Sequence, residues 1–468
     1  MGWVINAMAS VVSVMLNMDK WTAVWLCVII ALVYAILSGF WGVVVTDLVQ
    51  FVIAMFGSIA LAIIALNYVG GMEVLLSKLN ELLGSDVVTD NTLKFIPPIP
   101  DTGVATQTFW ESPFSKFLIF ISVMWWSHHG TDGGGYIIQR MSSAKNERHA
   151  LLATLWFNIA HYALRVWPWI IVAVVSIVMF PIIPSEYSEL GVKAGYPLVM
   201  NTLLGPGLKG ILIVSFLAAF MSTIDTHLNW GVSYLINDIY KRFFKPNESE
   251  RHYVLVGKIM TVILMILAAF TALKMQSISK AWEFIFAMGA GIGLVLILRW
   301  FWWRVNAWSE ITALATSIVI TISFEIIAYF QTINNNLEYS LFGSAPSIFG
   351  MSLQVHHKLM IIVPIAIIAW VTVTFFTEPE PMTKLESFYK RVQPGGWWGP
   401  VTSSFDHTLQ PVTKGIFILW LAGVMMIYGF TFGIGNLIFQ NYSSSVILFG
   451  FAGIGSYLIW NRNISKLT

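Results

Sequence analysis

Long apolar runs separated by short polar segments dominate the pattern of this chain. Most runs approach the about 20 residues that an α-helix needs to cross a bilayer. We expect helices over residues 21–38, 43–67, 114–126, 150–180, 208–235, 254–273, 282–303, 307–330, 359–376, 415–439 and 445–460. With a shorter opening run over 1–17, the pattern predicts an all-α polytopic membrane protein with about ten or eleven transmembrane helices.

The amino-acid composition is typical of a membrane protein. It is 57% hydrophobic and 11% charged, with a mean hydropathy of +0.74, whereas soluble domains carry about 25% charged residues. The net charge of +2 argues against a nucleic-acid partner. The only cysteine, Cys27, lies in an apolar run, which excludes a disulfide framework. The lipid bilayer is therefore the expected environment.

The polar segments predict the orientation and two surface helices. Alternate polar segments, among them those around 140–148, 241–258 and 384–391, together hold 16 of the 26 lysines and arginines, against 9 on the opposite side and Arg165 inside, so we expect them to be cytoplasmic. An amphipathic stretch at 72–83 predicts a helix within an external loop, and a second at 382–398 predicts a helix on the membrane surface.

One apolar run carries polar groups at helical spacing. Ala219, Ser222, Thr223 and Thr226 fall on one helix face, and Asp225 lies near its edge. Hydroxyls, a backbone carbonyl and a carboxylate are hard oxygen ligands that suit an alkali cation. The alternative is that the hydroxyls bond to their own helix or join it to a neighbour. A carboxylate in hydrocarbon costs about 3 kcal/mol or more, which favours a cation site.

A glycine-rich segment interrupts another run. The sequence WSHHGTDGGGY over 126–136 stands between apolar residues and the returning pattern YIIQR. Because irregular backbone at membrane depth is tolerated only where protein or a cavity covers it, this segment predicts an unwound helix that exposes polar groups to a solute. An ordinary loop between two short helices is the alternative.

The next run carries a polar stripe. Asn158, His161 and Arg165 are spaced i, i+3 and i+7, so their side chains share one face of a helix. A membrane histidine is usually a bond between helices, but a stripe with a permanent charge requires a partner or water.

Three motifs together resemble the sodium:solute symporter family of the sodium/glucose and sodium/proline type. AAFMSTIDT, followed by NDIYKR, resembles the family's eighth core helix, which carries Ala-x-x-Ser-Ser/Thr and ends in Asp-x-Tyr-Lys. SGFWGVVVTDLVQ (38–50) resembles its glycine-rich turn and Trp-Thr-Asp-x-x-Gln. GGGYIIQRMSSAKNERHA (133–150) resembles its Gln-Arg-x-x-x-Ala-Lys segment. The motifs follow the family's order and spacing.

The resemblance implies a leucine-transporter-like core of five plus five helices in an inverted repeat. It implies one transmembrane transporter domain over 1–468, with part of the third core helix at 1–17, core helices four to ten at 21–304 and accessory helices at 307–468. The first two core helices have no counterpart, so we expect a chain truncated at its N-terminus. A rearranged core, or helices supplied by a partner chain, is the alternative.

The resemblance also implies the ion site, with Na+ as the coupling ion. The carbonyl of Ala219 and the hydroxyls of Ser222 and Thr223 match the family's sodium ligands. Asp47 matches the aspartate of Trp-Thr-Asp and is expected to support a second site or the exit path. Asp225 and Thr226 stand where relatives with two sodium ions place serines.

The resulting hypothesis is a sodium-coupled symporter of a small polar solute, namely a sugar, an amino acid or a carboxylate. His161 falls where sugar-transporting relatives place a substrate-contacting lysine. The predicted solute contacts are the following: Trp125, Ser127, His128, Asp132, Asn158 and His161. We expect a bacterial inner (plasma) membrane protein.

Two alternatives to transport stay open. A transport-incompetent fragment or relative would fit the missing helices. A membrane enzyme would use His128, His129, His161 and Asp132, but the adjacent histidines point to opposite sides of a helix. We therefore expect neither an enzyme nor a transition-metal site.

Overall fold

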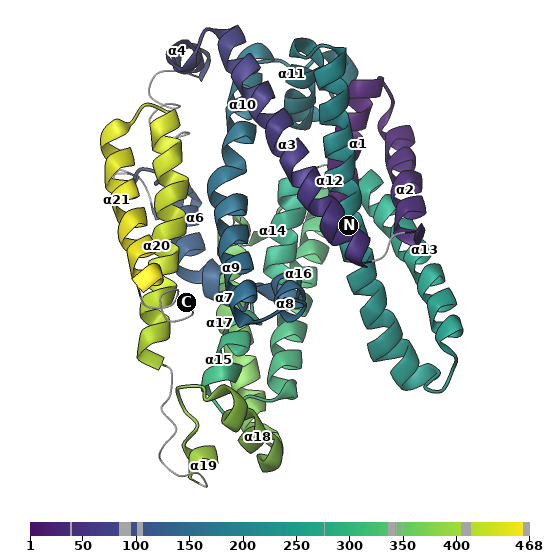
Figure 1. The fold of residues 1–468 in the computed structure, drawn as a ribbon, viewed down its shortest axis with the longest axis vertical. Coiled ribbons are helices and arrows are strands. Elements are labelled where there is room, and N and C mark those ends of the chain that lie inside the picture. Colours follow the sequence, from purple (N-terminus) through teal and green to yellow (C-terminus); the bar gives the residue numbers. More distant parts are fainter. Residues whose placement is uncertain are drawn as a thin grey trace. The chain divides into compact units, whose positions relative to one another are not determined.

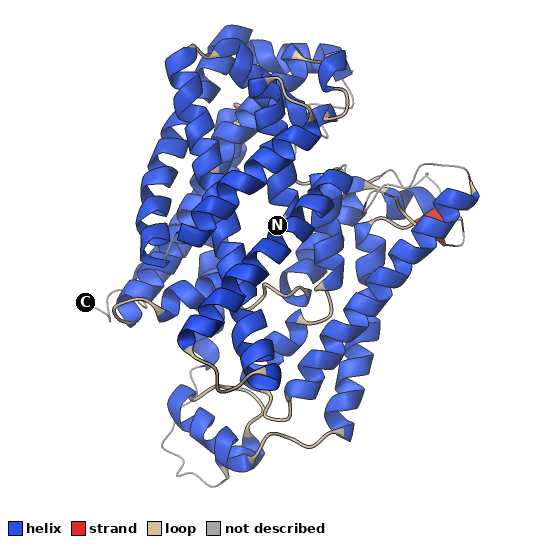
Figure 2. Cartoon of the chain, turned by 90° about the vertical axis from the view of Figure 1, so that its right-hand side faces the viewer, coloured by secondary structure: helices blue, strands red, loops and turns tan. Residues whose placement is uncertain are grey.

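The computed structural model describes residues 1–37, 40–83, 95–100, 106–275, 277–335, 342, 344–348, 350–403 and 413–461. The side chains of 36, 37, 40–47, 106–108, 136, 413, 414 and 416 lie outside this description. Within it the chain is almost entirely helical (Figure 2), and one antiparallel pair of strands joins β1 (Ser347–Ile348) to β2 (Met351–Ser352).

The chain divides into two compact units, Met1–Thr89 with Arg165–Ala281, and Asp90–Leu164 with Trp282–Thr468. The first unit contains α1 (Gly2–Leu16), α2 (Lys20–Leu37), α3 (Phe40–Val69), α4 (Met72–Leu83), α10 (Val166–Met179), η3 (Ser185–Tyr187), η4 (Gly191–Ala194), α11 (Gly195–Leu203), α12 (Pro206–Ser233), η5 (Tyr234–Phe244) and α13 (Glu250–Lys274).

The second unit begins with α5 (Thr106–Glu111), α6 (Pro113–Ile119), η1 (Phe120–Met124), α7 (Trp125–Ser127), α8 (Gly134–Ser142), α9 (Glu147–Asn158) and η2 (Ile159–Leu164). It continues with α14 (Ile278–Met288, whose first residues belong to the first unit), α15 (Gly293–Phe301), α16 (Ala307–Asn334), α17 (Val355–Phe376), α18 (Met382–Val392), α19 (Gly399–Thr402), α20 (Thr413–Ile438) and α21 (Tyr442–Ile459).

The membrane character predicted from the sequence is confirmed. Among the described residues, eight helices are long and apolar enough to cross a bilayer, or up to ten if each of two bent helix pairs is one span. The chain is thus an integral, multi-pass membrane protein. Helices form at both amphipathic stretches: α4 covers the one at 72–83, and α18 covers residues 382–392 of the one at 382–398.

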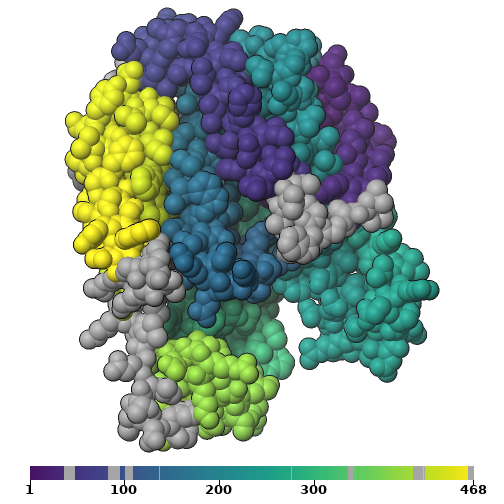
Figure 3. Space-filling view, viewed as in Figure 1, coloured from purple at the N-terminus to yellow at the C-terminus, as the bar shows by residue number. Residues whose placement is uncertain are grey.

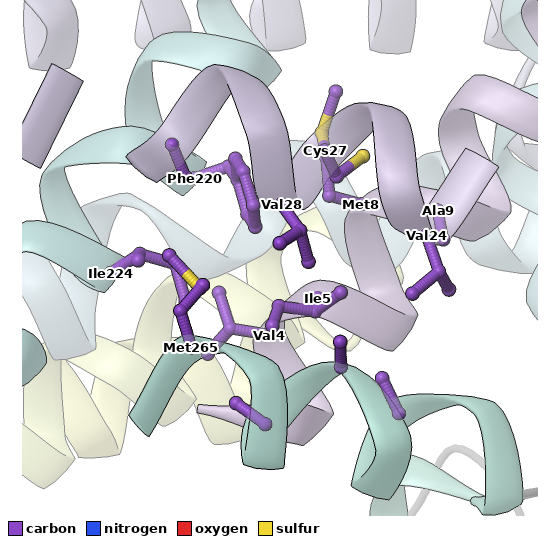
Figure 4. Packing of buried hydrophobic residues seen from close by; sticks show 14 of the residues in the cluster. Val4, Ile5, Met8, Ala9, Val24, Cys27, Val28, Phe220, Ile224 and Met265 are labelled. Carbon is purple, nitrogen blue, oxygen red and sulfur yellow. The ribbon is translucent and has the colours of Figure 1, made fainter. Parts of the chain in front are cut away.

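The core of the first unit is built by α1, α2, α12 and α13. Figure 4 shows Ile5 and Met8 of α1 among Val28 of α2, Ile224 of α12 and Met265 of α13. All five are buried, so α1 is an integral part of this bundle although it turns by 115° into α2. Because lipid tails are as apolar as these side chains, close packing is what their burial contributes to the association of the helices.

Polar side chains complete the last turn of α13. The buried Asn6 donates from Nδ2 to the carbonyls of Ala272 and Met275, both at 2.9 Å, and Lys20 donates to Leu273 and Met275 at 3.1 and 3.0 Å. These carbonyls have no partner within their own helix, because a helix leaves its last four unpaired. The cation at this end also complements the helix dipole.

In the second unit α20 and α21 form a close pair (Figure 1), and their atoms make one continuous yellow surface in Figure 3. The pair is close because glycines lie at the contact: a Cβ on Gly429 would lie 2.7 Å from the Leu448 oxygen, and one on Gly455 would lie 2.8 Å from the Met426 nitrogen. Small residues let membrane helices approach so that packing, rather than water exclusion, holds them together.

Lys193 of η4 generates a pH prediction for the first unit. Its Nζ donates to Asn6 Oδ1 at 3.2 Å. Burial, assisted by the charge of Lys20, lowers the pKa of Lys193 to about 8 from 10.5. Between these two pH values the unfolded chain holds a proton that the folded chain has released, so raising the pH stabilises the folded state.

We expect the free energy of unfolding of the wild type, relative to Lys193→Met, to rise by about 1 kcal/mol between pH 8 and 10.5, after allowance for solvent screening. Thermal unfolding in detergent, followed by tryptophan fluorescence, measures the difference. Parallel pH profiles for the two proteins would contradict this prediction.

Candidate functional site: two interlocked helix breaks and a hydroxyl-bearing helix

The glycine-rich segment interrupts a helix, as the sequence predicts. Ser112 caps the start by accepting a bond from the Ser115 amide at 3.2 Å. The helix then runs through α6, η1 and α7 and ends at Ser127. Residues 128–133 form turns, and Gly133 and Gly134 have φ of 97° and 67°, which favour glycine. The chain then resumes as α8.

The helix expected over 282–303 is not continuous, although its two parts together are long and apolar enough to form one broken span. The structure instead forms α14 and α15, bent by 41° around residues 289–292. Gly291 explains the break, since a Cβ there would collide with Ser317 Oγ and Ala366 Cβ and would lie 3.1 Å from the Ala313 oxygen. The chain can pass this close to α16 and α17 only without a side chain.

The two breaks pack directly on each other. A Cβ on Gly293 would lie 2.5 Å from the Trp126 oxygen and from the Ser127 carbonyl carbon, and one on Gly289 would collide with the His129 ring. The first residue of α15 therefore rests on the backbone at the end of α7. Backbone that is irregular at membrane depth is covered here by protein, as it must be.

Ser127 and His128 lie at this crossing. Ser127 is 1% exposed, and among the described residues its Oγ has no hydrogen-bond partner, so the crossing contains a buried hydroxyl available to a ligand or to water. His128 Nδ1 accepts from the Gly130 amide at 2.8 Å, and its ring lies 6.0 Å from that of Phe286.

Both carboxylate oxygens of Asp132 accept hydrogen bonds from other groups of the protein. Its Oδ1 accepts from the Gly134 amide at 3.0 Å, and its Oδ2 accepts from Arg299 Nη2 at 2.9 Å. Arg299 also lies 3.6 Å from Glu310 Oε2. The sequence pattern does not reveal this pair, because nothing in the stretch around Arg299 indicates a partner at residue 132.

The other predicted solute contacts lie on two further elements. Asn158 donates to the Thr154 carbonyl at 2.8 Å, and His161 in η2 stacks on Phe157 at 5.0 Å. A π-helical turn at this point is of interest because such turns frequently occur at functional sites. Trp125 lies 5.1 Å from Trp420 of α20, a partner that the sequence pattern does not reveal.

The predicted cation face lies on α12. Thr223 donates to the Ala219 carbonyl at 2.8 Å and Thr226 donates to the Ser222 carbonyl at 3.0 Å, so the back-bonding considered as an alternative is present. A hydroxyl that donates in this way keeps its lone pairs for a cation. Asp225 is fully buried and accepts from Asn229 at 3.0 Å, whereas Ala219 is exposed.

The candidate residues are therefore divided between the units. Those for sodium belong to the first unit and those for the solute to the second. Asp47 belongs to α3, and its side chain falls outside the described part of the chain.

Comparisons with known proteins give a consistent result. The family model described as "Sodium:solute symporter family" matches residues 4–319. Sodium/glucose cotransporter 1 of Oryctolagus cuniculus is 25% identical over 394 residues, which are 78% of this chain and 57% of that protein. An osmoregulated proline transporter of Bacillus subtilis is 23% identical over 320 residues, which are 65% of this chain and 58% of the transporter. The chain thus spans less than two thirds of these relatives.

A solved structure of a Na+-coupled sialic acid symporter, substrate-bound and outward-open, matches with a TM-score of 0.55 at 17% identity. The match covers 81% of this chain and 71% of the symporter. This likeness shows the fold, which is the leucine-transporter-like one that the motifs imply.

The close approach at the second break generates a stability prediction. We expect Gly291→Ala to lower the free energy of unfolding by about 1–3 kcal/mol, because the added methyl group overpacks the contact with Ser317 and Ala366. The matched control is Gly453→Ala in α21, where nothing lies within 4 Å of the added Cβ. Thermal unfolding in detergent compares the variants, and equal midpoints for Gly291→Ala and Gly453→Ala would refute the packing argument.

Proposed function

Because the chain belongs to the sodium:solute symporter family, we propose that it takes part in sodium-coupled symport of a small polar organic solute by alternating access. The proposal rests chiefly on the family match over residues 4–319, which includes both the first helix break and α12. Broken helices and hydroxyl-bearing helices are the parts with which transporters of this kind bind solutes and ions.

Sodium would be held on α12. The Ala219 carbonyl and the hydroxyls of Ser222 and Thr223 supply neutral oxygen ligands at the spacing that the family motif carries. The Ala219 carbonyl accepts the Thr223 hydroxyl as well as an amide of its own helix, so a cation would share this oxygen with bonds that it already accepts. Thr226 and the buried carboxylate of Asp225 would add ligands or electrostatic support, and Asp47 stays a predicted contributor to a second site.

The solute would contact the first break and the helix that carries His161. The buried hydroxyl of Ser127, the ring of His128 and the amide of Asn158 offer donors and acceptors, and Trp125 offers an aromatic face. Such mixed polar and aromatic groups suit a sugar, an amino acid or a carboxylate. Similar proteins include cotransporters named for glucose and mannose and a transporter named for proline, so the proposed class is a small polar organic solute. A bacterial plasma membrane is our proposed location.

If sodium binds on α12, the Ser222→Ala variant should respond to sodium more weakly than the wild type. In the purified chain, sodium in place of choline is expected to slow hydrogen exchange of the α12 amides, since the bound cation ties carbonyl and hydroxyl oxygens together. Ser222→Ala removes one ligand, so the sodium concentration that gives half of the effect should rise about tenfold. Thr261→Ala is the control, because it removes from α13 a hydroxyl that bonds the carbonyl one turn earlier, as Thr223 does on α12, but lies outside the proposed site.

An unchanged sodium dependence in Ser222→Ala would reject the assignment. Uptake by proteoliposomes that contain residues 1–468 tests transport itself: solute accumulation should follow an inward sodium gradient. Its absence across sugars, amino acids and carboxylates would contradict the proposed activity.

The solute assignment predicts that affinity depends on His161 and Ser127. A thermal-shift screen with sodium against choline identifies a stabilising solute. His161→Ala and Ser127→Ala should each raise its dissociation constant about five- to tenfold, the effect of one lost hydrogen bond. The control is His149→Ala, since His149 lies exposed at the start of α9 and bonds Asn146. Affinity unaltered in both site variants would remove this region from the solute site.

A further inference from the structure

Three charged residues meet where three helices of the second unit end. Asp132 precedes the first residues of α8, Arg299 lies in the last turn of α15, and Glu310 lies in the first turn of α16. The two carboxylates stand at helix N-termini and the guanidinium at a C-terminus, so each charge complements its helix dipole. We call this group the Arg299 node.

α15 contacts both sides of the first break. Its first residue, Gly293, lies against the backbone of Trp126 and Ser127 at the end of α7. Six residues later, about 9 Å along the helix, Arg299 binds Asp132 at the beginning of α8. α15 therefore bridges the break between α7 and α8 by contacting the chain on both sides of it.

The two contacts of α15, at Gly293 and at Arg299, differ in kind. At Gly293 the contact is made by backbone atoms, so no side chain can move away to open it. At Arg299 the contact is an ion pair whose side chains are 37% and 13% exposed, so water can replace each partner. Gly133 and Gly134, both at positive φ, follow Asp132 at the start of α8. The Gly134 amide donates to Asp132 Oδ1, so the carboxylate joins Arg299 to the first residue of α8 across the glycines. The polar contact is thus the one that can open, and the glycines are the place where the chain can turn.

We propose that Arg299 is a positioning residue of the transport cycle, which latches α8 to α15 through Asp132. Opening the latch lets α8 turn about Gly133–Gly134 while α7 stays fixed on Gly293. Asp132 then acts on helix geometry instead of binding the solute. The role in transport rests on the proposed function, whereas the latch is a local property of this unit.

Hydrogen exchange measured by mass spectrometry on the full chain in lipid nanodiscs tests the latch. Arg299→Gln should raise exchange of the α8 amides about five- to tenfold and leave those of α6 and α7 within about twofold. Asp132→Asn keeps an acceptor for the Gly134 amide but loses the charge, so it should give most of the same increase. Arg299→Lys keeps the charge and should restore at least half of the protection.

The control is Lys384→Gln, which removes an exposed ion pair with Glu380 in the same unit and should leave α8 unchanged. Unaltered α8 exchange in Arg299→Gln would overturn the proposal. So would a parallel rise in α7 and α8, because it would mean that Arg299 only supports the bundle as a whole.

Proteoliposome uptake tests the link to transport separately. Arg299→Gln should change the maximal uptake rate about fivefold or more while the solute dissociation constant stays within twofold, and Arg299→Lys should recover the rate. A changed affinity with an unchanged rate would place Arg299 in the solute site and overturn the positioning role. If the wild type shows no uptake, the proposed function fails, whereas the exchange result alone decides the latch.

Discussion

The lack of water in a bilayer is the constraint on which this structure depends. A helix that is interrupted in hydrocarbon leaves amides and carbonyls that only protein can cover. Here the interruption after α7 is covered by the interruption before α15, and Gly289 and Gly293 permit the contact by having no side chains. Each break thus makes the other tolerable. The pair creates a crossing at which the hydroxyl of Ser127 is buried.

Charged side chains follow the same logic. In each unit one of them acts at a helix end, where it satisfies unpaired backbone groups or complements the helix dipole. Lys20 binds the last carbonyls of α13 in the first unit, and Arg299 binds Asp132 beside α8 in the second. Asp225 differs, because it is fully buried within α12 and bonds Asn229 of the same helix. A carboxylate at such a position is costly, which is why we include it in the proposed ion site.

The hydroxyls of α12 illustrate how one group serves structure and binding together. Thr223 and Thr226 donate their protons to carbonyls one turn earlier, which satisfies each donor without a partner helix. The same bonds leave the hydroxyl oxygens as acceptors with nothing left to donate, and this is the form that an alkali cation requires. Back-bonding and cation binding are therefore compatible readings of the same residues.

The sequence by itself determined the membrane class, most helix positions, the first break and the family. These depend on local properties: apolar length sets a span, glycines at 130–135 weaken a helix, and α12 carries its motif within a single run. Only the tertiary structure decided that the span predicted over 282–303 breaks at Gly289–Ile292, because the cause is close contact with residues of α16 and α17. It also decided that Arg299 meets Asp132, 167 positions away. An ion pair between distant residues leaves no periodic trace in either segment, and folding alone brings the two charges together.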